Sequence, residues 1–321
     1  MAQYPASGPA LLIGGPTASG KSRVALALAR AFDGVVINAD SMQVYRDLRI
    51  LTARPTAEEE AQVPHRLFGV IDASVRCSVA AWLELARAAA DEAAAEGRLP
   101  ILAGGTGLYL ASFLDGLSPI PDVPGEVDAA LAHRIEEEGP HALHEELARR
   151  DPAAARRIPP GDRQRIQRAL GVVEASGEPL SAWQARPRSG GWPGPALQLR
   201  FDPPREALHA ACDRRFDAMM EAGALEEVAA LAGRRLPPEL PAMRALGVPE
   251  LIAHLEGRLA LAEAARRAKA ATRQYVKRQA TWFRHRAPDA LCLEGFGGGD
   301  AGRAAQDAAA RFLLTLNRSP A

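Results

Sequence analysis

The fold of this chain is decided by eight residues near its start, Gly15-Pro16-Thr17-Ala18-Ser19-Gly20-Lys21-Ser22. An apolar run at 10–14 precedes them and predicts a buried strand, and an amphipathic segment at 21–32 follows them and predicts a helix. A glycine-rich turn from strand to helix is the Walker A pattern, in which backbone N–H groups and a lysine hold phosphate and Ser22 can ligate Mg²⁺. We expect a phosphate-binding loop whose ligand the motif does not name. The alternative is a glycine-rich turn without a ligand.

The sequence around this loop alternates short apolar runs with helical patterns. Such alternation is typical of a mainly parallel sheet with helices on its faces, so we predict an α/β, P-loop NTPase-like core. Further strands are expected at 35–38, 67–71, 99–103, 196–202 and 290–294. Helices are expected at 79–96, 205–221, 225–232 and 259–284, with a last one ending near residue 317.

Two stretches rich in proline and glycine, 118–124 and 186–195, interrupt this alternation. Such stretches are typical of chain crossings between structural units. Between them, apolar residues recur at helical spacing and no strand pattern is visible. We therefore predict an all-helical insertion domain at 120–195, within a core made of residues 1–119 and 196–321.

The composition argues against several classes of protein. No apolar run approaches the roughly 20 residues that a membrane span needs, and the N-terminus lacks the pattern of a secretory signal. The three cysteines lie far apart, which argues against a disulfide framework or a zinc site. His141, His144 and Glu145 do not form a zinc-binding His-Glu-x-x-His helix, because position 148 is alanine. We expect a cytoplasmic monomer with no membrane partner.

Basic residues are concentrated in two places, although the chain balances 39 basic against 39 acidic residues. Residues 258–286 contain nine Lys or Arg and one acid, Glu263. On a helix, one face collects the cations Arg266, Lys269, Arg273, Lys277 and Arg284. The second cluster surrounds Asp162 only and consists of Arg156, Arg157, Arg163, Arg165 and Arg168. Two basic surfaces suit a large polyanion such as a nucleic acid; the alternative for the helix is a solvated charged face.

Three polar residues are expected at the carboxyl edge of the sheet, where ligands of open α/β folds bind. Asp40 follows the second strand and can accept a proton or help to hold a metal; alternatively it caps a turn. Thr106, in Gly104-Gly105-Thr106-Gly107, can place its hydroxyl near phosphate; alternatively it caps a helix. Asp72 resembles a Walker B acid, which keeps an ATP-dependent enzyme among the alternatives.

Several motifs follow one another along the chain in a specific order. They are the loop 15–22, the run 40–45 (Asp-Ser-Met-Gln-Val-Tyr), and the segments 104–109, 116–119, 162–170 and 271–279. Each motif alone is widespread, whereas the ordered set is specific. Over residues 10–295 the set strongly resembles the bacterial tRNA dimethylallyltransferase family, also called IPP transferases.

The resemblance implies transfer of a dimethylallyl group from dimethylallyl diphosphate to N6 of the adenosine 3′ to the tRNA anticodon, with Mg²⁺ as cofactor and diphosphate as product. It implies that the helical insertion grips the anticodon stem-loop while the base is flipped out. By position, Asp40 accepts the N6 proton, and Thr106 and Arg215 join the loop 15–22 at the diphosphate. The residues expected to contact tRNA are Asp40, Ser41, Met42, Gln43, Gln164, Arg165, Ile166, Gln167, Arg168, Arg244, Arg273 and Lys277, with Asp128 where the family often has a basic residue.

The chain departs from the family pattern at a few positions expected to face RNA. Val248-Pro249 stands where an aromatic and a cation are usual, and Leu51 and Arg54 replace common Gly and Lys. Two other function classes stay open. An ATP-dependent small-molecule kinase or NTPase leaves the basic surfaces unexplained, and an RNA-binding module with a vestigial loop is disfavoured by the intact Lys21 and Ser22.

Overall fold

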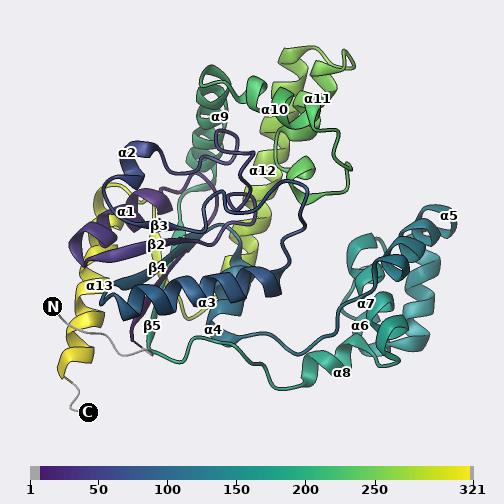
Figure 1. Cartoon of the computed structure of the whole chain (residues 1–321), viewed down its shortest axis with the longest axis horizontal. Helices are drawn as coiled ribbons and strands as arrows, with labels where there is room; N and C mark the ends of the chain where they lie inside the picture. Colours follow the sequence, from purple (N-terminus) through teal and green to yellow (C-terminus); the bar gives the residue numbers. More distant parts are fainter. Residues whose placement is uncertain (1–7, 319–321) are drawn as a thin grey trace. The chain divides into compact units, whose positions relative to one another are not determined.

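The computed structural model describes residues 8–318, which divide into two compact units. The α/β unit comprises the described residues up to Leu114 and from Trp192 onward, and the helical unit spans Asp115–Gly191. Each unit has a hydrophobic core of its own. Figure 1 labels several strands of the α/β unit and the helices of the helical unit.

The α/β unit is built on a parallel sheet that has six strands within the described residues, in the order β3-β2-β4-β1-β5-β6. The strands are β1 (Ala10–Gly14), β2 (Gly34–Asn38), β3 (His65–Arg66), β4 (Leu99–Gly104), β5 (Ala196–Asp202) and β6 (Leu291–Glu294). All residues of β1, β2 and β4 are buried, because helices or loops cover the central strands on both faces. The predicted α/β class with a parallel sheet is confirmed.

Helices pack on both faces of this sheet. On one face, α1 (Lys21–Ala31) and α13 (Gly299–Arg318) share a core with Leu11, Ile13 and Phe201. Leu12 points the other way because side chains alternate along a strand, and it lies beside α4 (Gly107–Asp115) and α12 (Leu261–Arg286). The other helices of the unit are α2 (Ala57–Glu60), α3 (Val79–Ala95), α9 (Arg205–Glu221), α10 (Ala224–Gly233), the 3₁₀ helix Pro241–Arg244 and α11 (Val248–Leu255).

Several elements differ from the sequence-based expectation; the short helix α2 and the 3₁₀ helix, for example, were not predicted. The predicted strand at 67–71 is wrong, because Leu67 and Gly69 adopt φ angles of 66° and 61° that turn the backbone after the two-residue strand β3. Ile71 keeps only an isolated bridge to Tyr45. Helix α11 was not expected, and Pro249 lies in its first turn, where a missing N–H leaves no helical hydrogen bond unmade.

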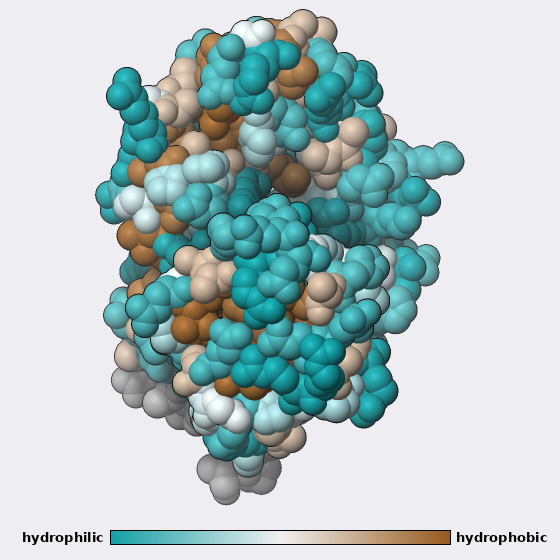
Figure 2. Space-filling view, turned by 90° about the vertical axis from the view of Figure 1, so that its right-hand side faces the viewer, coloured by the Kyte–Doolittle hydropathy of each residue, from teal (hydrophilic) through white to brown (hydrophobic). Residues whose placement is uncertain are grey.

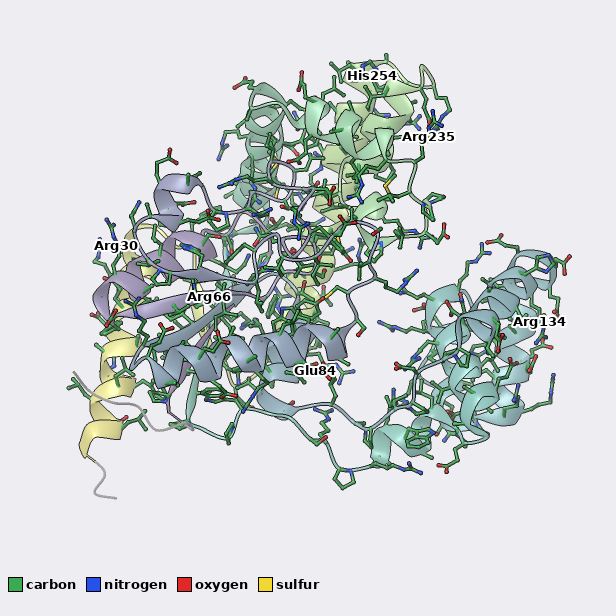
Figure 3. All side chains as sticks on the ribbon, in the orientation of Figure 1. Arg30, Arg66, Glu84, Arg134, Arg235 and His254 are labelled. Atoms are coloured by element: carbon green, nitrogen blue, oxygen red, sulfur yellow. The ribbon has the colours of Figure 1, made fainter. Side chains whose placement is uncertain are left out.

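The helical unit consists of α5 (Gly125–Arg150), α6 (Pro152–Ala155), α7 (Arg163–Ser176) and α8 (Leu180–Ala185). Helix α5 breaks at Gly139, whose φ of 80° is followed by Pro140. On its surface, Arg134, which is labelled in Figure 3, pairs with Glu138 at 2.7 Å and Glu146 at 2.8 Å. The core of this unit is formed by Leu131, Ile135, Leu143, Leu147, Ile166, Leu170 and Val172.

The surface shown in Figure 2 is largely hydrophilic, with apolar side chains in small groups between polar ones. Among residues 8–318, no helix combines the length and the apolar character that a bilayer crossing would need.

Candidate active site

The predicted phosphate loop connects β1 to α1, as the Walker A pattern requires. Gly20 caps the helix with a φ of 88° and Gly15 has a φ of 142°, both of which favour glycine. A Cβ on Gly15 would lie 2.9 Å from the carbonyl oxygen of Phe201. The loop leads directly into the first turn of α1, and the first N–H groups of a helix, which lack partners within the helix, are the usual geometry of an anion site.

Two desolvated cations lie at this loop. The Nζ of Lys21 donates to the carbonyl oxygen of Pro16 at 2.7 Å, and burial lowers its pKa from 10.5 to about 8, with nearby Asp40 opposing the shift and Arg215 adding to it. Burial also lowers the pKa of Arg215. Arg215 donates from Nη2 to the carbonyl oxygen of Thr52 at 3.3 Å. Lys21 and Arg215 are partly buried, and two partly buried cations near one another form a site suited to a multiply charged anion.

The affinity of the protein for inorganic diphosphate is expected to fall as the pH rises above about 8. Below that pH, Lys21 is already charged in the free protein, whereas above it binding must also take up a proton. The fall approaches about tenfold per pH unit. Calorimetric titration of the parent and Lys21→Arg, which stays charged, measures the difference. Equal pH slopes for the two proteins would contradict the assignment.

Asp40 lies immediately after β2, where backbone contacts fix its side chain. Its N–H donates to Oδ1 of Asn38 at 2.8 Å, and its own Oδ1 accepts from the N–H of Met42 at 2.9 Å. Asp40 therefore does cap a turn, but with one oxygen. Its Oδ2 accepts no hydrogen bond from the described residues and faces Gly105, where a Cβ would lie 3.3 Å away. One carboxylate oxygen is thus held in place and the other is available to accept a proton.

Thr106 is joined to the run that follows Asp40. Its Oγ1 accepts from the N–H of Ser41 at 2.9 Å and donates to Ser41 Oγ at 3.2 Å. Within the described residues its hydroxyl bonds to Ser41 and does not accept from a backbone N–H of α4. Tyr275 of α12 also interacts with Thr106, and burial, with Asp40 nearby, raises the pKa of this phenol. The structure thus brings Asp40, Ser41 and Thr106 together, and Lys21 and Arg215 lie close enough to Asp40 to interact with it electrostatically.

The loop at 49–54 supports two of the predicted site residues. Gln43 donates from Nε2 to the carbonyl oxygens of Thr52 at 2.9 Å and Ala53 at 3.0 Å, and Thr52 also accepts from Arg215. The carboxylate of Glu227 on α10 anchors this loop, because it accepts from three successive backbone N–H groups at 2.6, 2.7 and 2.9 Å. Glu227 was not found from the sequence, since nothing in its local pattern distinguishes it from a surface acid.

A second residue missed by the sequence analysis is Gln279 on α12. It is buried and accepts from the N–H of Thr17 at 2.9 Å while donating to the carbonyl oxygen of Gly105 at 2.8 Å. Its position on the face of α12 that also carries Val276 and Phe283 was the available signal, because a polar side chain among core positions needs a partner.

The basic face of α12 is only partly free. Although residues 258–286 contain a single acid, most of these cations have acid partners, because further carboxylates come from neighbouring elements that the helix pattern does not reveal. Lys269 pairs with Asp217 at 2.6 Å and Arg273 with Asp213 at 2.7 Å, both on α9. The remaining pairs are Arg266 with Glu263 at 2.7 Å and Arg284 with Asp202 at 3.5 Å. Lys277 is exposed and makes no ion pair with any residue in the described part of the chain.

The predicted RNA-contacting residues of the helical unit lie on α7. Gln164, Arg165 and Arg168 are exposed, whereas Ile166 is fully buried in the core, so its side chain does not face a ligand. Gln167 donates from Nε2 to Oδ1 of Asp128 at 2.7 Å.

The arginines of this unit are not grouped around Asp162 alone. Arg165 does pair with Asp162, at 3.5 Å, but Arg163 pairs with Glu136 of α5. Arg244, in the α/β unit, is exposed and donates to the carbonyl oxygen of Pro238 at 3.3 Å.

Asp72 is not a Walker B acid. It lies in a turn after the misassigned strand, where its Oδ1 accepts from the N–H and the hydroxyl of Ser74 at 2.9 and 2.6 Å. It pairs with Arg234 at 2.7 Å, and that pair holds its pKa well below the usual range. Its charge is therefore compensated by Arg234. Of the two motifs that suggested an ATP-dependent enzyme, only the Walker A loop is left.

The residues at the phosphate loop can hold a magnesium ion only when a bound phosphate supplies some of its ligands. Within residues 8–318, no group of three or more His, Cys, Asp or Glu could hold a metal ion. Mg²⁺ commonly binds through phosphate oxygens and water with few protein ligands. Ser22, exposed in the first turn of α1 beside Lys21, offers one such ligand.

The chain is similar to known proteins over most of its length. The profile of the family described as IPP transferase matches residues 43–286. The tRNA dimethylallyltransferase of Nitrobacter hamburgensis is 56% identical over 281 residues, which cover 87% of this chain and 89% of the relative. A tRNA dimethylallyltransferase of Rhodopseudomonas palustris is 57% identical over 281 residues, covering 87% and 88%.

Solved structures show the same fold over nearly the whole chain. The full-length tRNA isopentenylpyrophosphate transferase of Bacillus halodurans superposes with a TM-score of 0.70 at 32% identity, covering 96% of this chain and 98% of that one. A eukaryotic dimethylallyltransferase acting on tRNA gives a TM-score of 0.79 at 26% identity, covering 97% and 80%. With the profile covering most of its length and relatives more than half identical to it, the chain belongs to the IPP transferase family.

Proposed function

We propose that this chain transfers a dimethylallyl group from dimethylallyl diphosphate to N6 of the adenosine 3′ to the tRNA anticodon, with release of diphosphate. The observation that carries the proposal is that two partly buried cations, Lys21 and Arg215, lie near a carboxylate, Asp40, that keeps one oxygen available. The two cations can thus bind the leaving diphosphate, and the nearby carboxylate can accept a proton. Membership of the IPP transferase family supports the same reaction.

In the proposed reaction, the N6 lone pair forms a bond to the allylic carbon while the bond from that carbon to the diphosphate oxygen breaks. The electron pair leaves with the diphosphate, whose charge is stabilised by Lys21, Arg215 and the N–H groups of the loop 15–22. Mg²⁺, held by Ser22 together with phosphate oxygens, would add positive charge there. Oδ2 of Asp40 accepts the N6 proton. Thr106, the proposed further partner of the leaving diphosphate, also keeps the run 40–43 in place through Ser41.

The proposed partner is the tRNA anticodon stem-loop. Gln164, Arg165, Gln167 and Arg168 on the helical unit and Arg244, Arg273 and Lys277 on the α/β unit are the proposed contacts, with Ser41, Met42 and Gln43 near the base. Asp128 is not a cation and holds Gln167, so we assign it a supporting role. We further propose that the helical unit grips the stem-loop and that the enzyme acts as a monomer in the cytoplasm.

The deciding assay supplies dimethylallyl diphosphate and undermodified tRNA with Mg²⁺ and without ATP. Prenylated adenosine in the digested tRNA is the expected product. If folded protein yields none, while ATP is hydrolysed or a small molecule is phosphorylated, the rival kinase or NTPase function is correct.

Lys277 and Arg273 are expected to contribute differently to tRNA binding. Lys277→Ala should weaken binding and reduce the slope of log affinity against log salt by about one, because one unpaired cation is lost. Arg273→Ala also uncovers Asp213, whose charge then repels RNA, so we expect the larger loss of affinity there. Filter binding over a salt series measures both, with Arg273→Ala/Asp213→Ala as the control. A slope unchanged by Lys277→Ala would assign that side chain to solvent.

A further inference from the structure

Gln279 connects the two loops that form the proposed active site. Only 5% of this residue is exposed. Its Oε1 accepts from the backbone N–H of Thr17 in the phosphate loop, and its Nε2 donates to the carbonyl oxygen of Gly105, next to Thr106. One amide thus spans the segment that holds phosphate and the segment that positions Asp40 through Thr106 and Ser41.

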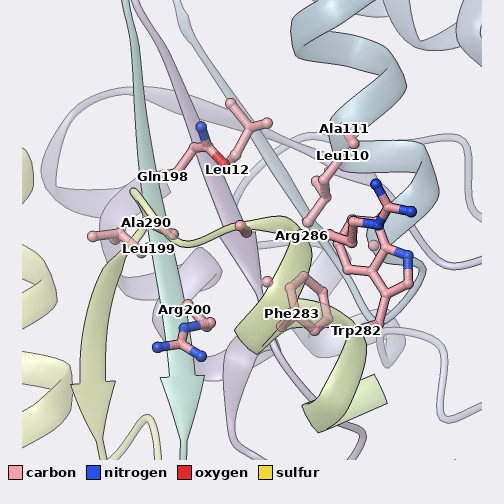
Figure 4. A pocket seen from close by; sticks show the side chains of 13 residues that line it. Leu12, Leu110, Ala111, Gln198, Leu199, Arg200, Trp282, Phe283, Arg286 and Ala290 are labelled. Atoms are coloured by element: carbon pink, nitrogen blue, oxygen red, sulfur yellow. The ribbon is translucent and has the colours of Figure 1, made fainter. Parts of the chain in front are cut away.

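The helix that carries Gln279 is packed directly onto these loops. A Cβ on Gly105 would lie 2.2 Å from Nε2 of Gln279, and a Cβ on Gly107 would lie 2.0 Å from the ring of Trp282. A Cβ on Gly14, at the end of β1, would lie 2.4 Å from Phe283. Figure 4 shows Trp282 and Phe283 side by side on α12 at the pocket that they line with Leu12 and Leu110. Side-chain-free backbone at Gly14, Gly105 and Gly107 is what allows this approach.

Tyr275, one turn before Gln279 on the same helix, extends the connection. Its hydroxyl interacts with the side chains of both Thr106 and Gln279, and Asp40 is near enough to help raise its pKa. The face of α12 formed by Tyr275 and Gln279 therefore contacts the phosphate loop, the Gly104–Gly107 loop and Thr106. A shift of this face would change the separation between the diphosphate site and Asp40.

We propose that Gln279 is a positioning residue that fixes the separation between the phosphate loop and the Thr106–Asp40 side of the site. An amide suits this place because it offers one acceptor and one donor in a fixed plane without charge. An apolar side chain would leave the Thr17 N–H and the Gly105 carbonyl buried and unpaired. This inference rests on the proposed prenyl transfer, since it assigns Gln279 a part in aligning the donor with the base.

The sharpest test is Gln279→Glu, because a neutral carboxyl group can replace the amide and an ionised one cannot. When protonated, its O–H donates to the Gly105 carbonyl while its other oxygen accepts from Thr17. When ionised, it repels the Gly105 carbonyl. Burial raises the pKa of a carboxyl, by up to 3–5 units, so the switch is expected between about pH 5 and 9. The ratio of variant to parent kcat should fall at least about tenfold across this range, whereas KM for tRNA should stay within about twofold.

Two further proteins and a second readout make the test decisive. Gln279→Leu should lower kcat about tenfold or more at every pH, and if it fails to fold, the Gln279→Glu ratio alone decides. Gln306→Glu makes the same chemical change on an exposed position of α13 and should show the parent's pH profile. Over the same pH range in which the kcat ratio falls, the Kd of Gln279→Glu for inorganic diphosphate should rise relative to that of the parent.

A ratio that stays constant with pH, or full activity of Gln279→Leu, would overturn the positioning role. Failure of the proposed function looks different. In that case the parent forms no prenylated adenosine. The pH dependence of diphosphate binding by Gln279→Glu still reports whether this side chain fixes the position of the phosphate loop.

Discussion

Replacing Asp40 with asparagine is expected to lower the rate of the chemical step by about 10²- to 10⁴-fold, the usual contribution of a positioned general base. Asparagine has the same shape, and its Oδ1 can still accept the N–H of Met42, so the turn after β2 is preserved. What is lost is the oxygen that can take the N6 proton. Single-turnover measurement with enzyme in excess isolates this step, and tRNA affinity should change little.

A matched control for this substitution lies at the other end of β2. Asp33 is exposed, precedes the strand and has a φ of 47°, which asparagine tolerates well. Asp33→Asn should leave the single-turnover rate unchanged. If Asp40→Asn retains the parental rate, or if both variants lose activity equally, Asp40 is not the proton acceptor.

Replacing Lys21 with methionine is expected to lower kcat/KM for prenyl transfer by about 10²- to 10³-fold, as removal of one group that stabilises developing charge commonly does. The stability of the folded protein, in contrast, should not fall. Burial lowers the pKa of Lys21 from 10.5 to about 8, so at neutral pH its charge is unfavourable in the free folded protein. Removal of the charge should leave the thermal midpoint unchanged or higher, as is usual for groups placed for function.

The comparison for Lys21 is Arg30, at the C-terminal end of the same helix, which is labelled in Figure 3. Arg30 interacts favourably with the helix dipole, so Arg30→Met should lower stability slightly and leave kcat/KM unchanged. Thermal unfolding and steady-state kinetics of the three proteins measure both effects. A Lys21→Met protein that is destabilised and fully active would remove Lys21 from the phosphate site.

Local patterns were sufficient where a structural element is defined by its own residues. The loop 15–22 is recognised by a strand, a glycine turn and a helix that follow one another directly in the sequence. Its glycines adopt positive φ angles, which are a property of the local backbone. The helix at 205–221 was predicted with the bounds that α9 has. The segment 67–71 failed because an apolar run can also be a buried loop, and positive φ angles at Leu67 and Gly69 are not visible in hydropathy.

By itself the sequence determined the α/β class, the phosphate loop, and the placement of Asp40 and Thr106 at the ends of strands, because hydrophobic period and glycine turns act over short distances. Only the tertiary structure decided which charges on the basic helix are free. The carboxylates that pair with Lys269 and Arg273 come from a helix more than fifty residues away in the chain. It also decided that Gln279 joins Thr17 to Gly105, across 262 and 174 residues. Such pairings depend on how distant elements pack, and no local pattern encodes them.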